Sequence, residues 1–364
     1  MKSLRFEEAA PYVQTLGRVY PDEVRKAIWL NWTCTGLRFT FTGRLLKADM
    51  LGIAGMNFGI ELPYIGITVD GGTELTQRIR VDEGENTYTL LETAKEERHT
   101  ITIWKLSENA RGKCAVRSLY TDGALQPVKT VEPALRLEFV GDSITCGYGN
   151  EASGRDAPFK PEEENGFMAF SAMTARILEA KFQCISVSGI SVAVDPEGLK
   201  IPGLRGMEEL YPYTDRLFEE LSGEEFFRPW DFARNPVDAV ILNLGTNDVN
   251  AYKFTNDIGK ARGFFQTRYL AFLKTLRRCN GPGTYILCTL GPLDYYLYDE
   301  IRDIVEAYIS QTGDRQVSCF KFGAVVQWSE GFGAVGHPSL KTHERMSREL
   351  SDELNRVFHE GRLL

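Results

Sequence analysis

The stretch Leu135-Arg-Leu-Glu-Phe-Val-Gly-Asp-Ser-Ile-Thr145 decides how the rest of the chain is interpreted. Its first six residues are mostly apolar, which is typical of a short buried strand in a parallel sheet. Gly141 breaks this pattern, and Asp142-Ser143 follows where a strand would lead into a helix or loop. A serine at this position presents its hydroxyl at the carboxyl edge of the sheet, where open α/β folds bind ligands. Ser143 is therefore a candidate nucleophile, although Gly-Asp-Ser is also ordinary turn composition.

Length and composition indicate a soluble globular protein with two domains. The chain has 364 residues, of which 43% are apolar and 25% charged, so a sizeable core can be buried. A formal net charge of −8 argues against nucleic acid or an anionic membrane as the main partner. The cysteines show no Cys-x-x-Cys pair and are expected to be apolar core residues in a reducing compartment; they are Cys34, Cys114, Cys146, Cys184, Cys279, Cys288 and Cys319.

The segment before residue 125 is rich in short strand patterns. Apolar and polar residues alternate in several of them, and turn sequences at 70–72, 83–86 and 109–112 separate them; the expected strands are 28–33, 36–41, 65–69, 87–91, 100–104 and 115–120. Many short strands at regular spacing predict an antiparallel β-sandwich or jelly roll. We expect this domain to cover residues 1–125 and a linker to cover 126–134.

From residue 135 to 364 strands alternate with long amphipathic helices. The expected strands are 135–140, 183–188, 237–244, 284–290 and 316–322, and the clearest helices are 166–181, 256–278, 298–311 and 339–358. This alternation predicts a three-layer α/β/α domain with a mostly parallel, five-stranded sheet.

Three further motifs follow predicted strands or precede the last helix. They are Ser186-Val-Ser-Gly189, Leu244-Gly-Thr-Asn-Asp248 and Gly333-Ala-Val-Gly-His-Pro338. With Gly141-Asp-Ser-Ile-Thr145 they supply a serine, a glycine, an asparagine and a histidine in that order. This set suits acyl transfer, in which a serine attacks, a histidine moves its proton, and backbone and asparagine donors hold an oxyanion.

With these four motifs the sequence resembles the SGNH (GDSL-type) hydrolase superfamily. The order of domains and the final motif His337-Pro-Ser-Leu-Lys-Thr-His343 resemble carbohydrate esterase family 2, whose members remove acetyl groups from xylan, mannan or their oligosaccharides. The resemblance implies that Ser143 is the nucleophile and His337 the general base. It also implies an oxyanion hole formed by the N–H groups of Ser143 and Gly189 and by the Asn247 side chain.

Each of these residues also has a simpler interpretation. Gly189 could serve only a turn, Asn247 could cap a helix, and His337 could be an ordinary loop histidine. His343 is a rival base, but positions six apart on a helix face different directions, so both histidines cannot easily reach Ser143. Asp142 and Asp248 are expected to accept hydrogen bonds from backbone in their own turns.

The sequence departs from the superfamily at the third catalytic position. An aspartate usually stands two or three residues before the histidine, but here those positions are Val335 and Ala334. Either a backbone carbonyl orients His337, giving a Ser–His dyad, or an acid comes from elsewhere in the fold. Some members of the carbohydrate esterase family also lack this aspartate.

Other features concern substrate, cofactor and compartment. Tyr148, Tyr252 and Trp328 are candidates for stacking on sugar rings, with core packing at least as plausible for each. Four histidines without a ligand-spaced pattern imply no metal, and no cofactor is expected. No signal peptide or membrane span is recognisable, so a cytoplasmic location is expected if the chain is complete.

The sequence thus predicts a serine esterase that deacetylates carbohydrates, with acetylated oligosaccharides as substrate. A lipase, thioesterase or arylesterase on the same domain is the alternative, and acyl-chain preference would separate the two. A carbohydrate-binding protein with an inactive hydrolase domain is a third possibility, which turnover of any aryl acetate would exclude. The sugar, the acetylated position, the oligomeric state and the role of the sandwich domain stay open.

Overall fold

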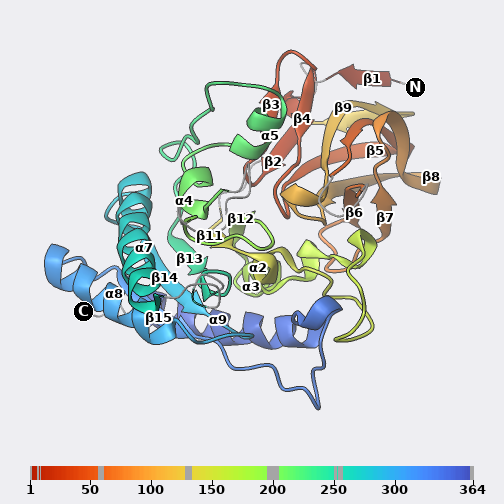
Figure 1. The fold of residues 1–364 in the computed structure, drawn as a ribbon. Helices are drawn as coiled ribbons and strands as arrows, with labels where there is room; N and C mark the ends of the chain where they lie inside the picture. Colours follow the sequence, from red (N-terminus) through yellow and green to blue (C-terminus); the bar gives the residue numbers. More distant parts are fainter. Residues whose placement is uncertain are drawn as a thin grey trace. The chain divides into compact units, whose positions relative to one another are not determined.

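The chain divides into two compact units in the computed structural model (Figure 1), which describes residues 2–5, 8, 10–55, 61–127, 133–194, 205–249, 252 and 257–360. One unit comprises Met1–Glu132 and Lys160–Phe167, and the other comprises Pro133–Phe159 and Met168–Leu364. Residues 128–132 of the predicted linker 126–134 lie outside the described residues, so the domain boundaries at 125 and 135 stay predictions. The return of Lys160–Phe167 to the first unit has no counterpart in the sequence patterns.

In the described residues of the first unit, ten strands form one antiparallel sheet, which confirms the antiparallel all-β prediction; the jelly-roll topology stays a prediction. The strand order is β3-β4-β9-β5-β8-β6-β7, with β1 paired to β9 and both β2 and β10 paired to β5. The strands are β1 (Lys2–Arg5), β2 (Val13–Leu16), β3 (Tyr20–Asp22), β4 (Ala27–Trp29), β5 (Gly36–Ile53), β6 (Tyr64–Val69), β7 (Gln77–Arg80), β8 (Gly84–Lys105), β9 (Lys113–Thr121) and β10 (Ala124–Gln126).

Two long strands, β5 and β8, pair along nearly their whole lengths. Alternate side chains of β5, such as Leu37, Phe39 and Phe41, are buried in the core of this unit. The predicted strands 87–91 and 100–104 both lie in β8, which joins them into one strand and begins inside the predicted turn 83–86. Residues 92–99 connect these two parts: Glu92 and residues 97–99 pair with β5, and a register shift lies between them.

The second unit contains a five-stranded sheet in which every pairing is parallel, which confirms the predicted sheet. The strands are β11 (Arg136–Gly141), β12 (Lys181–Ser186), β13 (Ala239–Asn243), β14 (Tyr285–Leu290) and β15 (Val317–Lys321), in the order β12-β11-β13-β14-β15. The chain moves from β11 to β12 on one side and then returns to β13 on the other. The carboxyl end of β11 is therefore a topological switch point, the place where open α/β sheets bind ligands.

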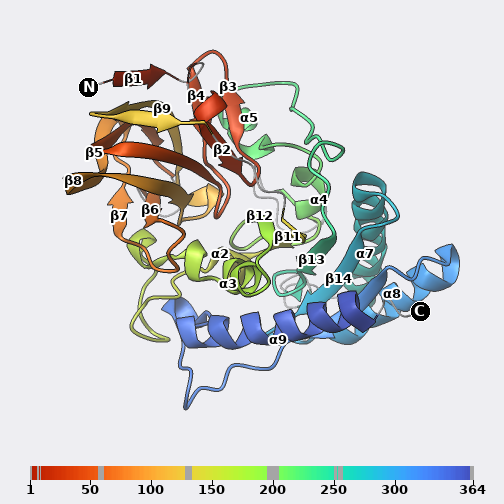
Figure 2. The ribbon, with the colours of Figure 1, turned by 180° about the vertical axis from the view of Figure 1, so that it is seen from behind.

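Helices cover both faces of this sheet. On one face α3 (Phe170–Ile177) and α9 (Leu340–Glu360) lie side by side (Figures 1 and 2), and Phe170 and Met346 pack with Phe139 of β11. On the other face Tyr211 hydrogen bonds to Glu138, which points away from Phe139, and packs edge-on against Phe272 of α7. The remaining helices are α2 (Ser143–Cys146), α4 (Met207–Leu210), α5 (Arg216–Leu221), α7 (Ile258–Asn280) and α8 (Tyr298–Thr312).

Two further findings concern the cysteines and the length and polarity of the helices. All seven cysteines are free thiols, and burial raises the pKa of Cys184 to about 12, which keeps this thiol protonated at neutral pH. Within the described part of the chain, every helix is too short or too polar to cross a membrane.

Candidate active site

Ser143 is the first residue of α2, directly after β11. The Asp142 side chain caps this short helix by accepting a hydrogen bond from the Ile144 N–H at 3.0 Å. Residue 141 has to be glycine, since a Cβ there would lie 2.0 Å from the Thr145 hydroxyl oxygen. Ser143 is only 8% exposed. The sharp turn therefore holds the hydroxyl in one place at the switch point of the sheet.

His337 reaches Ser143 from the loop between the 3-10 helix η5 (Ala334–Gly336) and α9. Its Nε2 lies 3.0 Å from the Ser143 Oγ, and its Nδ1 lies 3.1 Å from the carbonyl oxygen of Ala334. With the ring proton on Nδ1 donated to this carbonyl, the lone pair of Nε2 accepts from the serine hydroxyl. The partner of Nδ1 is thus a backbone carbonyl three residues before the histidine.

Backbone hydrogen bonds hold the histidine loop against the loop that follows the serine. The bonds run from Ala334 N to Gly149 O (2.9 Å), from Val335 N to Ala157 O (3.0 Å), from Gly336 N to Arg155 O (3.0 Å) and from Leu340 N to Asn150 O (3.1 Å). The approach is so close that a Cβ on Gly149 would lie 2.4 Å from the Ala334 Cβ. This pairing fixes Ala334 and His337 relative to Ser143, although the two loops are far apart in sequence.

Tyr148 supports the imidazole of His337. The two ring centroids are 4.3 Å apart, and on its other side Tyr148 stacks on Phe159 at 4.1 Å. Such a stack restricts the rotation of the histidine ring. The structure therefore gives Tyr148 a contact inside the site, and its predicted contact with sugar is not tested.

The predicted oxyanion donors differ in whether their N–H groups already donate a hydrogen bond. Neither the Ser143 N–H nor the Gly189 N–H donates a hydrogen bond to any described residue. Gly189 is exposed and has a φ of +78°, which favours glycine. The Asn247 amide nitrogen, in contrast, donates to the Asp142 Oδ2 at 3.2 Å and to the Ile190 carbonyl at 3.1 Å. An amide has two N–H bonds, so an oxyanion would have to share one of them with these acceptors.

Asp142 and Asp248 are the acidic residues of two of these motifs, and both carboxylates accept hydrogen bonds. Asp142 bonds to backbone in its own turn, as expected, and also accepts from Asn247. Asp248 differs from the expectation, because both of its oxygens accept from the Val192 N–H in the loop after β12, at 3.0 and 3.2 Å. Burial, with a smaller contribution from the Asp142 charge, raises the pKa of Asp248 to about 7. No three His, Cys, Asp or Glu side chains gather into a possible metal site within the described ranges.

His343 lies in the core and contacts α3. Its Nδ1 accepts a hydrogen bond from the Phe170 N–H at 3.1 Å, and its ring is parallel to that of Phe170. Burial, reinforced by the neighbouring His337, lowers the pKa of His343 to about 3. His343 is thus a neutral packing residue whose accepting nitrogen is already occupied.

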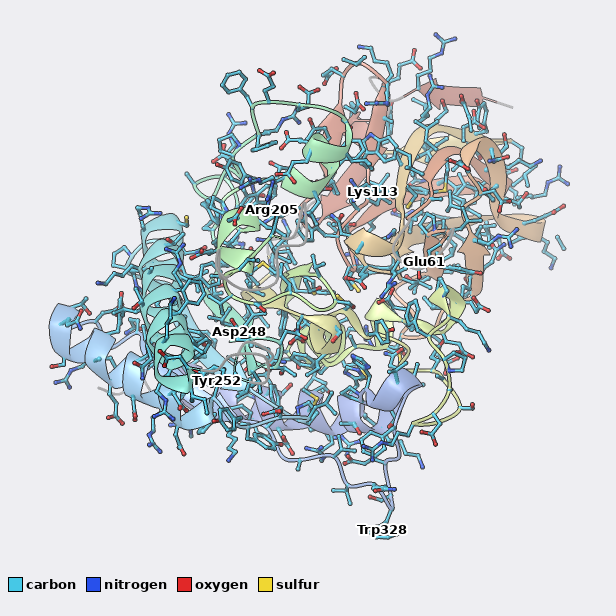
Figure 3. All side chains as sticks on the ribbon, in the orientation of Figure 1. Glu61, Lys113, Arg205, Asp248, Tyr252 and Trp328 are labelled. Atoms are coloured by element: carbon cyan, nitrogen blue, oxygen red, sulfur yellow. The ribbon has the colours of Figure 1, made fainter. Side chains whose placement is uncertain are left out.

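The two remaining aromatic candidates lie in contrasting places (Figure 3). Tyr252 is buried and packs edge-on against Tyr296, whereas Trp328 is 95% exposed in the loop before η5. Neither placement tests a sugar contact. Of the two alternatives for orienting His337, the structure shows the backbone carbonyl; the sequence could not tell which one, because any residue can supply a backbone oxygen and only the loop geometry selects Ala334.

A Ser–His pair at the carboxyl edge of a parallel α/β/α sheet is the arrangement of the GDSL-type hydrolases. The chain belongs to the GDSL-like lipase/acylhydrolase family, whose model matches residues 139–345, more than half of the 364 residues. Residues 15–129 match the model of the carbohydrate esterase 2 N-terminal domain. The predicted resemblance is confirmed for both parts of the chain.

The curated relatives carry esterase or deacetylase names. The cellulase/esterase CelE of Acetivibrio thermocellus is 33% identical over 339 residues, which cover 86% of this chain but only 39% of that protein. The chain thus spans about 39% of the length of this relative. An acetylxylan esterase/glucomannan deacetylase of Cellvibrio japonicus is 24% identical over 350 residues, covering 96% of this chain and 89% of that protein.

Solved structures of similar fold come from the same group of enzymes. A family two carbohydrate esterase from Clostridium thermocellum in complex with cellohexaose has a TM-score of 0.79 and 27% identity, and the match covers 95% of this chain and 99% of that one. An acetyl xylan esterase from the rumen bacterium Butyrivibrio proteoclasticus has a TM-score of 0.84 at 22% identity, covering 99% and 100% of the two chains. The latter similarity shows the fold alone.

Proposed function

We propose that the protein is a serine esterase that removes O-acetyl groups from carbohydrates, with acetylated xylo- or manno-oligosaccharides as substrates. The observation that carries this proposal is the 3.0 Å contact between the Ser143 Oγ and the His337 Nε2 at the switch point of the sheet. The named relatives support the choice of ester, since they are acetylxylan esterases and glucomannan deacetylases.

In the first half of the reaction Ser143 is acylated. Its Oγ attacks the acetyl carbonyl carbon while its proton moves to the Nε2 of His337. The tetrahedral intermediate then collapses, the bond between the carbonyl carbon and the sugar oxygen breaks, and His337 returns the proton to that oxygen. The deacetylated sugar leaves, and the acetyl group stays on Ser143.

In the second half water releases the acetyl group. His337 takes a proton from the water molecule as the water oxygen attacks the acyl carbon, and then returns that proton to the Ser143 Oγ as the bond between Oγ and the acyl carbon breaks. The product is acetic acid, which ionises in solution to acetate and a proton. The negative oxygen of each intermediate needs donors, and the proposed ones are the N–H groups of Ser143 and Gly189, which donate to none of the described residues. Asn247 is proposed as the third donor, and it shares its amide with Asp142 and Ile190.

His337 works in this proposal as part of a dyad. The Ala334 carbonyl, 3.1 Å from Nδ1, selects the tautomer that carries its proton on Nδ1 and leaves Nε2 unprotonated. A carbonyl carries a partial charge only, so it stabilises the imidazolium less than a carboxylate would. The Tyr148 stack and the backbone pairing of the two loops then provide orientation that a third carboxylate would otherwise contribute.

The specificity can be tested with two sets of esters. Mass spectrometry of acetylated xylo- and manno-oligosaccharides after incubation should show loss of acetyl groups with the sugar chain intact. On 4-nitrophenyl esters, acetate should be hydrolysed and octanoate should not. Preference for octanoate would favour a lipase-type esterase, and no turnover of either ester would favour the carbohydrate-binding alternative.

A further inference from the structure

A hollow of about 460 Å³ lies beside the two loops that carry the serine and histidine motifs. One wall is the segment Asn150–Arg155, and the other walls come from the loop before η5 and from the first turn of α9, including Glu330, Phe332 and Lys341. Its volume is in the range of ligand sites, roughly 300–1,000 Å³. Ser143, Gly189 and Asn247 do not line it, so the hollow is distinct from the oxyanion donors described above.

Two cations at this hollow have no acidic partner. Within the described part of the chain, no carboxylate lies within ion-pair distance of Arg155 or of Lys341. The Arg155 guanidinium lies over the Phe332 ring at 5.0 Å, and the Lys341 ammonium contacts only the Ser329 carbonyl at 3.4 Å among the hydrogen-bond acceptors described. Both side chains are exposed, so their donors are available to a ligand.

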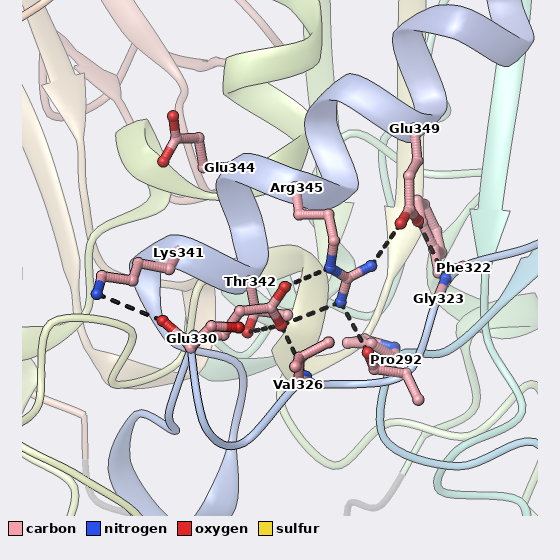
Figure 4. A network of polar contacts seen from close by, with 12 residues as sticks. Pro292, Phe322, Gly323, Val326, Glu330, Lys341, Thr342, Glu344, Arg345 and Glu349 are labelled. Atoms are coloured by element: carbon pink, nitrogen blue, oxygen red, sulfur yellow. Dashed lines mark hydrogen bonds and ion pairs between the residues drawn. The ribbon is translucent and has the colours of Figure 1, made fainter.

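Two acids, Glu151 and Glu330, also line the hollow, and Glu330 is held by other groups. Its carboxylate pairs with Arg345 and accepts hydrogen bonds from the Thr342 hydroxyl and the Val326 N–H, both at 3.0 Å (Figure 4). Burial alone would raise the pKa of Glu330, but these hydrogen bonds outweigh burial and lower it. Arg345 thus shares its single positive charge between Glu330 and Glu349, and the network fixes the loop that forms this wall.

Residues that line the hollow contact both chain neighbours of His337. The Arg155 carbonyl accepts from the N–H of Gly336, the residue before His337, and the Arg155 Cγ and Nε lie 3.8 Å from where a Gly336 Cβ would stand. Phe332 forms a β-bridge with Pro338, the residue after His337. A sugar bound in the hollow would therefore lie beside the loop that carries His337.

We propose that this hollow binds an acidic sugar, a hexuronic acid residue of the acetylated oligosaccharide, through its carboxylate. Arg155 offers a planar fork that matches a carboxylate, Lys341 adds a second positive charge, and Phe332 offers an apolar face. This inference rests on the proposed function, because it names the kind of acetylated carbohydrate that the esterase prefers. Arg155 is then a specificity-determining residue.

Binding can be measured without turnover, by calorimetry with ligands that carry no acetyl group. We expect the wild-type protein to bind xylotetraose bearing a glucuronic acid branch about fivefold more tightly than plain xylotetraose, a size typical of a partly exposed ion pair. The difference should vanish in 0.5 M NaCl, because salt screens such pairs. Equal affinity for the two ligands at low salt would overturn the proposal.

Substitutions of Arg155 test whether the preference for the acidic ligand arises in this hollow. Arg155→Gln should remove the preference and Arg155→Lys should retain part of it, with melting temperatures near that of the wild type. Arg278→Gln changes an exposed arginine of α7 whose described side-chain contact is with the Thr275 hydroxyl, and it should keep the full preference. A preference that persists in Arg155→Gln contradicts the assignment, as does inorganic phosphate at 1 mM displacing the acidic ligand.

Failure of the acidic subsite and failure of the esterase proposal give different results with the same ligands. If the protein hydrolyses no acetyl ester yet binds the acidic oligosaccharide through Arg155, the esterase proposal fails and the binding site stands. If acetyl esters are hydrolysed while acidic and neutral ligands bind alike, the esterase stands and the acidic subsite fails.

Discussion

The His337 Nε2 lies 3.0 Å from the Ser143 Oγ, although the two residues are 194 positions apart in the chain. The carboxyl end of β11 presents the serine, and backbone hydrogen bonds between the loops at 149–157 and 334–340 bring the histidine to it. The contact therefore depends on loop pairing as much as on the sheet.

The histidines of the last motif should behave differently on mutation. His337→Ala should lower kcat for 4-nitrophenyl acetate by about 10⁴-fold or more, because the proton acceptor of Ser143 is lost. His343→Asn should keep kcat within about tenfold of wild type at pH 7.5, since His343 contacts Phe170 and not the serine. Steady-state kinetics of both variants measures this, and a larger loss in His343→Asn than in His337→Ala would reverse the assignment.

His343 should also make the protein sensitive to acid. Its pKa is about 3 when folded and about 6.5 by reference, so the unfolded chain binds more protons between these values. The resulting stability is complete above pH 6.5 and is lost as the pH falls toward 3, with a total on the order of a few kcal/mol. Urea unfolding at pH 7.5 and 4.5 should therefore show a smaller loss of stability for His343→Asn than for wild type.

Asp248 changes the pH dependence of stability in the opposite direction, because its pKa is raised in the folded protein. It is present in both the wild type and His343→Asn, so its contribution cancels when the two are compared. An equal loss of stability in the wild type and in His343→Asn would contradict a buried neutral His343.

Asn247→Ala should lower kcat by roughly 10²–10³-fold with a smaller change in KM, because an oxyanion donor acts in the transition state. It should also lower the melting temperature, as the amide joins Asp142 to the Ile190 carbonyl. Kinetics and thermal unfolding measured together separate the roles. A lowered melting temperature with an unchanged kcat would mean that Asn247 only holds these loops together.

Tyr148→Ala should reduce kcat by about three- to tenfold, because loss of the stacked ring frees the His337 imidazole to rotate, and such pairs contribute about 0.5–1.5 kcal/mol. Tyr148→Phe is the matched control, since it keeps the ring and should keep most of the activity. Similar losses in both variants would point to the hydroxyl and contradict a stacking role.

Val335 has a φ of +50° and is 60% exposed, so a β-branched side chain is strained there without packing in return. Val335→Asn should raise the free energy of unfolding by about 1 kcal/mol, because asparagine adopts this conformation more easily. Its backbone bond to Ala157 is unaffected, so activity should persist. Destabilisation in urea unfolding would show that the strain is not relieved.

The sequence predicted most of the second unit because its strands are apolar runs and its helices are amphipathic. The strand β11 and the helix α8 begin or end within a residue or two of the predicted bounds. Where the long strand β8 runs, the sequence predicted two shorter strands, because residues 92–99 lack an apolar pattern and only the pairing of both parts with β5 joins them. Local pattern cannot report such long-range pairing.

For the candidate site, the motifs located Ser143 and His337, but not what orients the histidine. The Ala334 carbonyl and the Tyr148 stack depend on how two loops pair, and no residue type marks a carbonyl that is used in this way. Arg155 was missed for the same reason: it stands in an unremarkable loop and gains its position from a backbone bond to Gly336.

The most direct test is the rate of acetate release from acetylated xylo-oligosaccharides by wild type and by Ser143→Ala, in preparations free of other esterases. We predict steady release of acetate by the wild type and a rate at least about 10⁴-fold lower for the variant, with an unchanged fold by circular dichroism. Release by Ser143→Ala within tenfold of the wild type would contradict the serine mechanism.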